Sequence, residues 1–254
     1  MRIVAALLFL VVPLYGQAES IEDLLRVTEV RIEKRTEASG IIHYSAEAEL
    51  HCSSPTPITA YTLTYVTSYA DGTVLKGTLW EDFVPTLPLV GMKVLGSRKV
   101  QIGPLRNGDT HHFPFSLTGT ASKAVPTKVK VEITGVVFED CTVAGRDEKN
   151  LDWIFADRQR SLRVYQGQLS AASEARRSVS EAKIIPHLRS KLSEAENGLT
   201  KNGLMRDLDN AERQAALGRE VPRIWLAQYE KKLLSYISDF ERHQTQKRRA
   251  GKPN

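Results

Sequence analysis

The hydrophobic pattern of this chain changes its period once, near Gly145, and that change constrains the fold more than any other feature. Before it, apolar and polar residues alternate, as they do on half-buried β-strands, and residues 42–52 show the alternation most clearly. After it, apolar residues recur at steps of three and four, which is the pattern of amphipathic helices. The sequence therefore predicts a β part followed by a helical part.

Turn signals divide the β part into about seven short strands. Residues 58–69 are rich in β-branched and aromatic side chains and run into Asp71-Gly72, a dipeptide that favours a tight hairpin. Residues 127–140 have the strongest strand pattern, and Pro114 confines its own strand to a sheet edge or a bulge. Short strands at this spacing predict an immunoglobulin-like sandwich of two antiparallel sheets, with a closed barrel as the alternative.

The helical part is predicted to form a small bundle of three or four antiparallel helices. Pro186 is expected to end or kink the first helix, because proline lacks the amide hydrogen and clashes with the preceding turn. Two Asn-Gly pairs, at 197–198 and 202–203, predict turns, and Pro222 suits the first turn of the last helix. The last apolar stripe comprises Trp225, Leu226, Tyr229, Leu233, Ile237 and Phe240.

We therefore expect an α+β protein in which an N-terminal immunoglobulin-like antiparallel β-sandwich precedes a C-terminal helical bundle. The expected boundaries are residues 19–146 for the sandwich, 147–249 for the bundle and 250–254 for a disordered tail. The junction between the two parts is short and charged and contains no Gly/Ser/Pro linker. We expect the two parts to lie rigidly against each other.

Residues 1–18 have the layout of a secretory signal peptide. A positive charge at Arg2 precedes an apolar stretch over residues 3–15, and the small residues Gly16 and Ala18 precede the expected cleavage point. A helix of 13 residues rises only about 20 Å, which is too short for a hydrocarbon core of ~30 Å and argues against a membrane anchor. We expect an exported protein, periplasmic or extracellular, with no transmembrane segment in the mature chain.

Positive charge is concentrated in the helical part. From Leu151 onward the chain carries 20 Lys and Arg against 13 Asp and Glu, a net charge of +7, whereas the preceding residues carry −2. A solvated tail is one interpretation of the basic end, and docking to an anionic envelope surface is the other. The expected partner is an unknown protein or an envelope polyanion, and no nucleic acid, because the chain is expected to be exported. The residues expected to form this surface are Arg242, Lys247, Arg248, Arg249 and Lys252.

The chain has two cysteines, Cys52 at the end of a predicted strand and Cys141 in the turn after the strongest one. In an immunoglobulin-like topology these positions emerge at the same end of the sandwich. In an exported protein we therefore expect them to form a disulfide, which would stabilise the fold by roughly 4–5 kcal/mol. The alternative is two buried reduced thiols. A catalytic thiol is disfavoured, because the nearest histidine, His51, points to the opposite face of a regular strand.

The other motifs with a possible chemical role lack the companion residues that such a role requires. His111-His112 is the one histidine cluster, but neighbours on a strand diverge, and no HExxH or CxxC motif accompanies them. Ser180 and Lys183 match the Ser-x-x-Lys spacing of serine acyltransferases that act on cell-wall peptides, without that family's companion motifs. We assign no catalytic, cofactor-binding or metal-binding residue, and we expect no cofactor.

Three tyrosines of the strand over residues 58–69 share one face with Leu63, namely Tyr61, Tyr65 and Tyr69. One interpretation is a platform for a carbohydrate or another ligand. The other is a set of core aromatics that face the opposite sheet, and it fits the general tendency of such residues to pack inside a β-sandwich. The core interpretation is the one that we expect.

The segments SSPTPITAYTLTY (residues 53–65) and VVFEDCTVAGRD (residues 136–147), followed by a helical C-terminal part, resemble uncharacterised exported proteins of environmental bacteria. The resemblance covers roughly residues 45–70 and 127–155, and its motifs are turns and strands. It implies the order of sandwich and then helices, and it carries no catalytic residues. Such sequences have a glycine where this chain has Cys141, a departure that fits a cysteine recruited to pair with the other one.

We expect a non-catalytic extracytoplasmic interaction or scaffold module, with an association with the cell envelope. The expected fold is prone to binding, although a fold does not by itself imply a function. The alternative is an enzyme whose active site is dispersed along the sequence. A deep pocket with clustered ionisable groups would favour the enzyme, whereas a shallow surface with an exposed apolar or basic patch would favour the module.

Overall fold

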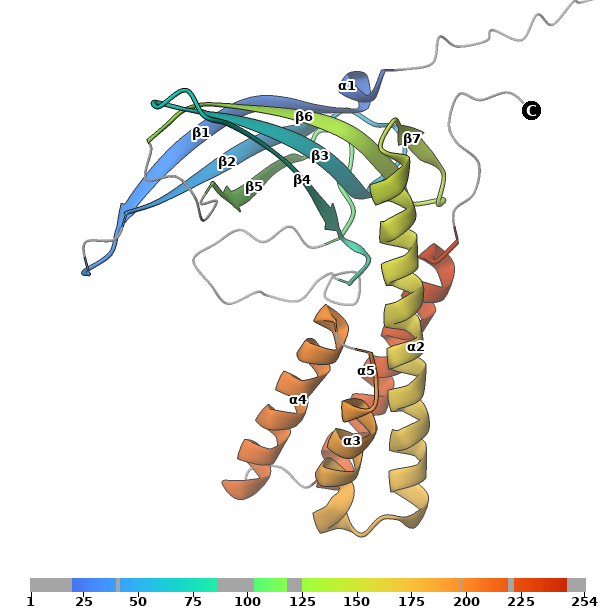
Figure 1. Cartoon of the computed structure of the whole chain (residues 1–254). Coiled ribbons are helices and arrows are strands. Elements are labelled where there is room, and N and C mark those ends of the chain that lie inside the picture. Colours follow the sequence, from blue (N-terminus) through green and yellow to red (C-terminus); the bar gives the residue numbers. More distant parts are fainter. Residues whose placement is uncertain are drawn as a thin grey trace, which may run out of the picture.

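The computed structural model of this chain is an α+β arrangement, with two antiparallel sheets followed by helices (Figure 1). The expected signal peptide and the basic residues beyond position 245 lie outside the part of the chain that the structure describes. The described residues are 20–39, 42–85, 103–117, 125–196, 198–218 and 222–245.

Seven strands and six helical segments make up the described part of the chain. The strands are β1 (Leu25–Thr36), β2 (Ile42–Cys52), β3 (Ile58–Tyr69), β4 (Val74–Asp82), β5 (Thr110–Ser116), β6 (Pro126–Phe138) and β7 (Val143–Gly145). The helices are α1 (Ile21–Leu24), α2 (Glu148–Ser178), a 3₁₀ turn (Glu181–Lys183), α3 (Ile184–Ser193), α4 (Leu199–Ala216) and α5 (Pro222–His243).

The strands form one sheet with the order β1-β2-β5 and a second with the order β4-β3-β6-β7, and all neighbours are antiparallel. Strand β5 lies at an edge, which is where its Pro114 can be accommodated, since proline has no amide hydrogen for a ladder. Strand β4 lies at an edge of the second sheet and ends close to the helices (Figure 1). This edge strand positions the site described below.

The alternation along the strands builds a hydrophobic core between the two sheets. Ala48 and Leu50 of β2 contribute to it from the first sheet, and Leu63 of β3 contributes from the second. Tyr61 belongs to the same core and Tyr65 packs against it partly buried, as predicted for core aromatics, while Tyr69 is buried outside this cluster. A fully buried side chain of the size of leucine contributes about 1.5–3 kcal/mol to folding.

The second sheet is covered on its other face by the first half of α2. The helix begins after Asp147, whose side chain accepts a hydrogen bond from the Asn150 amide, and such caps satisfy the unpaired amides of a first turn. Leu151 and Phe155 then pack with Val137 of β6 in a separate small core. The long helix thus joins the sheets to the rest of the helical part.

The second half of α2 packs with α3, α4 and α5 around one further hydrophobic core, and α2 and α5 run side by side (Figure 1). The i, i+4 stripe of α5 supplies Leu233, Ile237 and Phe240 to it, as its spacing predicts. Pro222 is the first residue of α5, which confirms its predicted role. No helix in the described ranges combines the length and the apolar composition needed to cross a membrane.

Two predictions about breaks in the helices are wrong. Pro186 does not end the first helix, which stops at Ser178; it lies in the first turn of α3, where its missing amide hydrogen has no helical partner to lose. Asn202-Gly203 is not a turn but lies inside α4, because Leu204 and the apolar residues that follow it pack into the helical core. Tertiary packing therefore outweighs the local preference of the Asn-Gly pair.

The expected disulfide is also corrected by the structure. Both cysteines are described, and neither forms a disulfide. Cys52 lies in the core between the two sheets, whereas Cys141 lies in the small core between the second sheet and α2. The two thiols are on opposite faces of the second sheet, so the β-sheet itself separates them. The alternative interpretation, two buried thiols, describes what the structure contains.

Candidate functional site

A cleft lies where the end of β4 meets the helices, and we call it the junction cleft. It encloses about 750 Å³, which is within the ~300–1,000 Å³ typical of small-molecule sites. Its walls come from β4 and from three helices. They include Trp80, Glu81 and Asp82 of β4, Asp157, Ser161 and Tyr165 of α2, Thr200, Gly203 and Asp207 of α4, and Lys232, Tyr236 and Phe240 of α5.

Regular spacing explains why these side chains reach one cavity. On α2 and on α5 the lining residues follow one another at steps of four, and residues four apart lie on the same face of a helix. On β4, Trp80 and Asp82 share one face by the alternation of a strand; Glu81 also lines the cleft, although its carboxylate bonds Tyr61 and lies against His111. The cleft is therefore a product of ordinary helical and strand periodicity at the meeting point of four elements.

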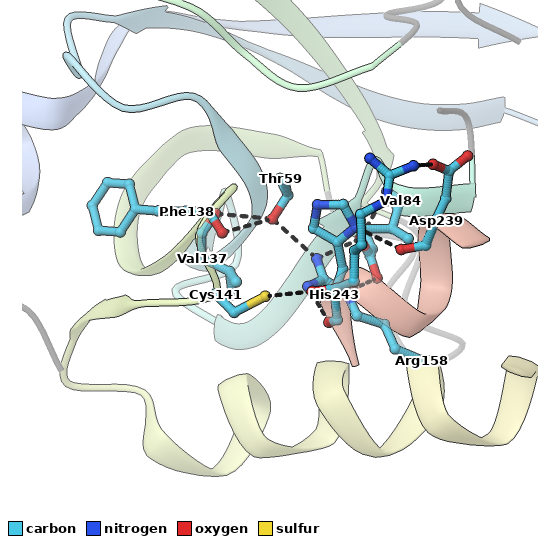
Figure 2. A network of polar contacts seen from close by, with 10 residues as sticks. Thr59, Val84, Val137, Phe138, Cys141, Arg158, Asp239 and His243 are labelled. Atoms are coloured by element: carbon cyan, nitrogen blue, oxygen red, sulfur yellow. Dashed lines mark hydrogen bonds and ion pairs between the residues drawn. The ribbon is translucent and has the colours of Figure 1, made fainter. Parts of the chain in front are cut away.

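A buried arginine of α2, Arg158, joins this helix to β4 through Asp82, which lines the cleft (Figure 2 shows Arg158 in its polar network). Arg158 is 1% exposed, and its Nε and Nη2 atoms donate hydrogen bonds of 2.8 Å each to the two carboxylate oxygens of Asp82. Its Nη2 also donates to the Thr59 hydroxyl at 3.2 Å, and its guanidinium carbon lies 5.3 Å from the centre of the Phe155 ring. Bidentate pairs of this kind combine charge with fixed geometry.

The same arginine fixes the end of the last helix to the sheets. Arg158 Nη1 donates to the backbone carbonyl of His243 at 3.0 Å, and Cys141 Sγ donates to the carbonyl of Arg242 at 3.3 Å (Figure 2). These carbonyls have no partner within the helix, because the last four carbonyls of a helix are left over. His243 donates from its Nδ1 to the carbonyl of Asp239 at 2.6 Å. The C-terminus of α5 is thus docked on the β part.

Most of the charged groups on the walls of the cleft are paired within the protein. Lys232 Nζ lies 2.7 Å from the Asp207 carboxylate, and Arg160 Nη1 lies 3.0 Å from the Asp157 carboxylate. Burial raises the pKa of the Asp157 carboxyl from its ordinary value; the charge of Arg160 opposes this change, and that of Asp82 adds to it. Arg206, on the rim, forms no ion pair with another described residue.

A hydrogen-bonded cluster of Tyr61, Glu81 and His111 lies beside the cleft and joins the two sheets. The Tyr61 hydroxyl donates to Glu81 Oε2 at 2.7 Å, and His111 Nε2 lies 2.7 Å from the same oxygen. Burial raises the pKa of Tyr61 well above its ordinary value, and the nearby charge of Glu81 adds to this effect. Glu81 is the member of the cluster that also lines the cleft.

Aromatic rings, together with Pro85, Leu199 and Leu204, make up the apolar part of the cleft. Tyr165 and Tyr236 stack with ring centres 4.7 Å apart and planes within 5° of parallel, and burial raises the pKa of Tyr165. Trp80 meets Trp153 of α2 in an edge contact, with ring centres 4.4 Å apart. Trp80 is 41% exposed, so a large aromatic ring remains open to solvent at the cleft. Trp153 is 40% exposed as well, so the two touching rings form an exposed apolar patch beside the cleft, and such patches mark candidate contact surfaces.

The residues that the sequence singled out lie elsewhere. Arg242 is exposed and pairs with Asp239 at 2.6 Å, and the other predicted tail residues are outside the described ranges. His111 and His112 diverge as predicted: His111 contacts Glu81, whereas His112 contacts a glutamate on the outer surface. Ser180 and Lys183 are exposed in the connection before α3 and do not line the cleft. Within the described residues, no group of three or more histidine, cysteine or acidic side chains is arranged to hold a metal ion.

Sequence reasoning missed the junction cleft, although one signal for part of it was present. Arg158 falls on the apolar stripe of α2, between Phe155 and Leu162, where a charged residue is rare unless it has a buried partner. That position indicates a buried ion pair, but nothing in the sequence identifies Asp82 as the partner. The cleft itself combines positions from 80 to 240, so no local motif marks it.

Comparison with known proteins adds no identification. No family model matches this chain, and no curated protein matches it. It is similar in part to a solved structure described as a hypothetical protein from Peptoclostridium difficile 630, with 13% sequence identity and a TM-score of 0.30 over 51% of this chain and 89% of that one. A likeness at that TM-score carries no argument about fold or function.

Proposed function

We propose that this protein is a non-catalytic binding module that holds a ligand in the junction cleft, as an extracytoplasmic interaction or scaffold protein. The observation that carries the proposal is the cleft itself, a cavity of ligand size in which Asp82, Asp157 and Asp207 are already paired within the protein. A cavity with convergent polar groups and aromatic walls is the usual form of a small-molecule site.

The pairing of the wall charges favours binding over catalysis. Asp82 is engaged by both nitrogens of a buried guanidinium, and Asp207 is held by Lys232. A general base or a nucleophile must be free to take a proton or attack a substrate, and a carboxylate committed to a fixed cation is poorly placed for either role. Such a wall is better suited to hold a ligand by shape, stacking and hydrogen bonds.

The buried Arg158 supports the same proposal in another way. Its hydrogen bonds join β4, α2 and the end of α5, which are three of the four elements that form the cleft. A cavity held in shape before a ligand arrives loses less conformational entropy on binding. The sheets and the helices thus provide a preformed site between them.

An enzyme is the second candidate, and one specific observation favours it. Burial raises the pKa of the Asp157 carboxyl, and Glu81, whose Oε2 accepts from Tyr61 and lies within hydrogen-bond distance of His111, lines the same cleft. Two carboxyl groups in different environments are a recurring basis of acid–base catalysis. This candidate predicts chemical conversion of a bound ligand, which the first candidate does not.

We also propose the finer fold and the compartment. The strand orders β1-β2-β5 and β4-β3-β6-β7 correspond to strands A-B-E and C′-C-F-G of an immunoglobulin-like sandwich without its D strand, and the shared core of α2 to α5 supports a small helical bundle. The layout of residues 1–18 supports export to the periplasm or beyond. An unknown protein or an envelope polyanion remains our proposal for a partner of the basic C-terminal end.

A matched pair of glycine substitutions tests the binding site. Gly203 lines the cleft and Gly167 does not; both lie in helices, and a Cβ atom built on either would meet nothing within 4 Å. Gly203→Phe should fill the cleft, whereas Gly167→Phe should add the same ring elsewhere. Both changes remove a glycine from a helix interior, so neither is expected to lower stability.

Thermal unfolding is then measured with cellotetraose, chitotetraose, the common amino acids, spermidine and citrate. A ligand at about 100 times its Kd stabilises the folded state by ~2.7 kcal/mol, which raises the Tm by about 5–11 °C for a chain of this size. We expect at least one probe to do so with the wild type and with Gly167→Phe, and not with Gly203→Phe. Equal shifts in all three proteins, or none in any, would contradict the proposal, and mass spectrometry of the probe separates binding from conversion.

A further inference from the structure

The charges around the junction cleft cancel. Four carboxylates line it, from Glu81, Asp82, Asp157 and Asp207. Arg206 and Lys232 line it too, and Arg158 and Arg160 pair with Asp82 and Asp157. Arg160 is shared with Glu196, which also lies 4.0 Å from Arg163, so the lining groups and their ion-pair partners hold five acidic and five basic side chains. Because a charged ligand is favoured by a site of opposite net charge, neither an anion nor a cation is selected here.

The walls nevertheless offer many hydrogen-bonding groups. Ser161 and Thr200 place hydroxyls 2.8 Å apart on facing helices, and the carboxylate of Asp157 and the ammonium of Lys232 lie on the same walls. An apolar ligand would remove these groups from water without replacing their hydrogen bonds, which is unfavourable. The cleft therefore suits a ligand that is uncharged and rich in hydroxyl groups.

The exposed ring of Trp80 adds a second, independent observation. Trp80 lies on the edge strand β4, where it is held by the edge contact with Trp153 and still leaves 41% of its surface open. A tryptophan in this position offers a flat apolar surface beside polar groups. The C–H faces of a sugar ring match such a surface, while the hydroxyls at its rim match the polar walls.

We propose that the ligand of the junction cleft is a neutral oligosaccharide, one ring of which stacks on Trp80. This inference rests on the proposed binding function and names its ligand class. The cavity volume of about 750 Å³ lies in the upper part of the usual range for small-molecule sites, which favours a short oligosaccharide over a single sugar. The hydroxyls of Ser161 and Thr200 and the charged groups of Asp157 and Lys232 bind the remaining sugar hydroxyls.

Calorimetric titration with cellotetraose, chitotetraose, maltotetraose and xylotetraose tests the proposal, with tetragalacturonate as a charged oligosaccharide of similar size. We expect at least one neutral compound to bind and tetragalacturonate to bind at least about tenfold more weakly, since its carboxylates gain no net attraction. Binding of none of the neutral compounds, or preferred binding of tetragalacturonate, overturns the assignment.

Substitutions at the tryptophans locate the contact. Trp80→Ala should weaken binding at least about tenfold, and Trp80→Tyr should restore most of it, because tyrosine keeps a flat aromatic face. Trp225→Ala is the control, because Trp225 stacks on Tyr229 and does not line this cleft. Wild-type affinity in Trp80→Ala overturns the stacking contact. If Trp80→Ala does not fold, Trp80→Tyr and Gly203→Phe still decide, since the first must bind and the second must not.

The two proposals fail separately. If spermidine, citrate or an amino acid raises the Tm and Gly203→Phe abolishes the effect, while no neutral oligosaccharide binds, the junction cleft is a binding site and the saccharide assignment is wrong. If a neutral oligosaccharide binds equally well to Gly203→Phe, the saccharide class is right for this protein, but the cleft is not where it binds, and both proposals about the cleft are overturned.

Discussion

Replacing Arg158 with methionine should destabilise this protein more than almost any other single change of a charged residue. The side chain of Arg158 is 0% exposed and that of Asp82 is 15% exposed. Arg158→Met therefore leaves a largely buried carboxylate without its cation, and it also leaves the carbonyl of His243 without its donor. Breaking a buried ion pair from one side costs about 3–5 kcal/mol.

The expected loss corresponds to a Tm that is about 6–20 °C lower, given a change of about 2–4 °C per kcal/mol for a chain of this size. Urea unfolding followed by circular dichroism at pH 7 measures the free energy directly. Arg31→Met is the matched control, because the ion pair of Arg31 with Glu29 is exposed and exposed pairs contribute far less to stability than buried ones.

A double-mutant cycle separates the ion pair from general damage to the core. Asp82→Asn keeps the acceptor oxygen for the Val84 amide and removes the charge. We expect Arg158→Met combined with Asp82→Asn to be less destabilised than the sum of the single changes by at least about 1 kcal/mol. The reasoning is refuted if Arg158→Met costs no more than Arg31→Met, or if the two changes at Arg158 and Asp82 are simply additive.

Three further predictions follow from the titratable and polar groups. Thiol labelling of unfolded, unreduced protein should find two reactive cysteines per chain, and one disulfide per chain would contradict the structure. Labelling of the folded protein should find almost none, because Cys52 and Cys141 are buried. Tyr61→Phe should lower the free energy of unfolding by about 1 kcal/mol in urea titrations, because Glu81 loses a hydrogen bond, and an unchanged value would show that this bond contributes nothing. The pKa of the Asp157 carboxyl is raised in the folded state, so the folded protein binds this proton more tightly than the unfolded chain does. The stability that this proton gives is lost as pH rises from 3.8 through the folded pKa. Asp157→Asn should therefore gain stability relative to the wild type between pH 4 and pH 7, and the opposite trend would contradict the raised pKa.

The strands and the long helix could be predicted because their signals are local. Alternation marks β2 and β3, and the acidic N-cap Asp147 marks the start of α2 within a few residues of the change in period. The two wrong predictions about helix breaks show the limit of such signals. Pro186 is compatible with a first helical turn as well as with a helix end, and Gly203 is tolerated inside α4 because Leu204 and Leu208 of the same helix are buried.

The candidate site could not be predicted, because it depends on contacts between distant parts of the chain. The pairing of Asp82 with Arg158 joins β4 to α2 across 76 positions, and the spacing of neither residue indicates the other. The disulfide prediction was wrong for the same reason. It assumed that strand ends on one side of a sandwich bring their side chains together, whereas Cys52 and Cys141 lie in different cores. Whether the two thiols could meet depended on the side of the sheet to which the Cys141 side chain points, and the sequence does not reveal this for a turn residue.

The most direct test of the account is a crystal structure of the protein with the oligosaccharide that gives the largest rise in Tm. The account predicts that the ligand lies in the junction cleft, with one sugar ring on the face of Trp80 and hydroxyls within hydrogen-bond distance of Asp157 and Lys232. A ligand bound elsewhere on the molecule, with the junction cleft empty, would contradict the central claim that this cleft is the binding site.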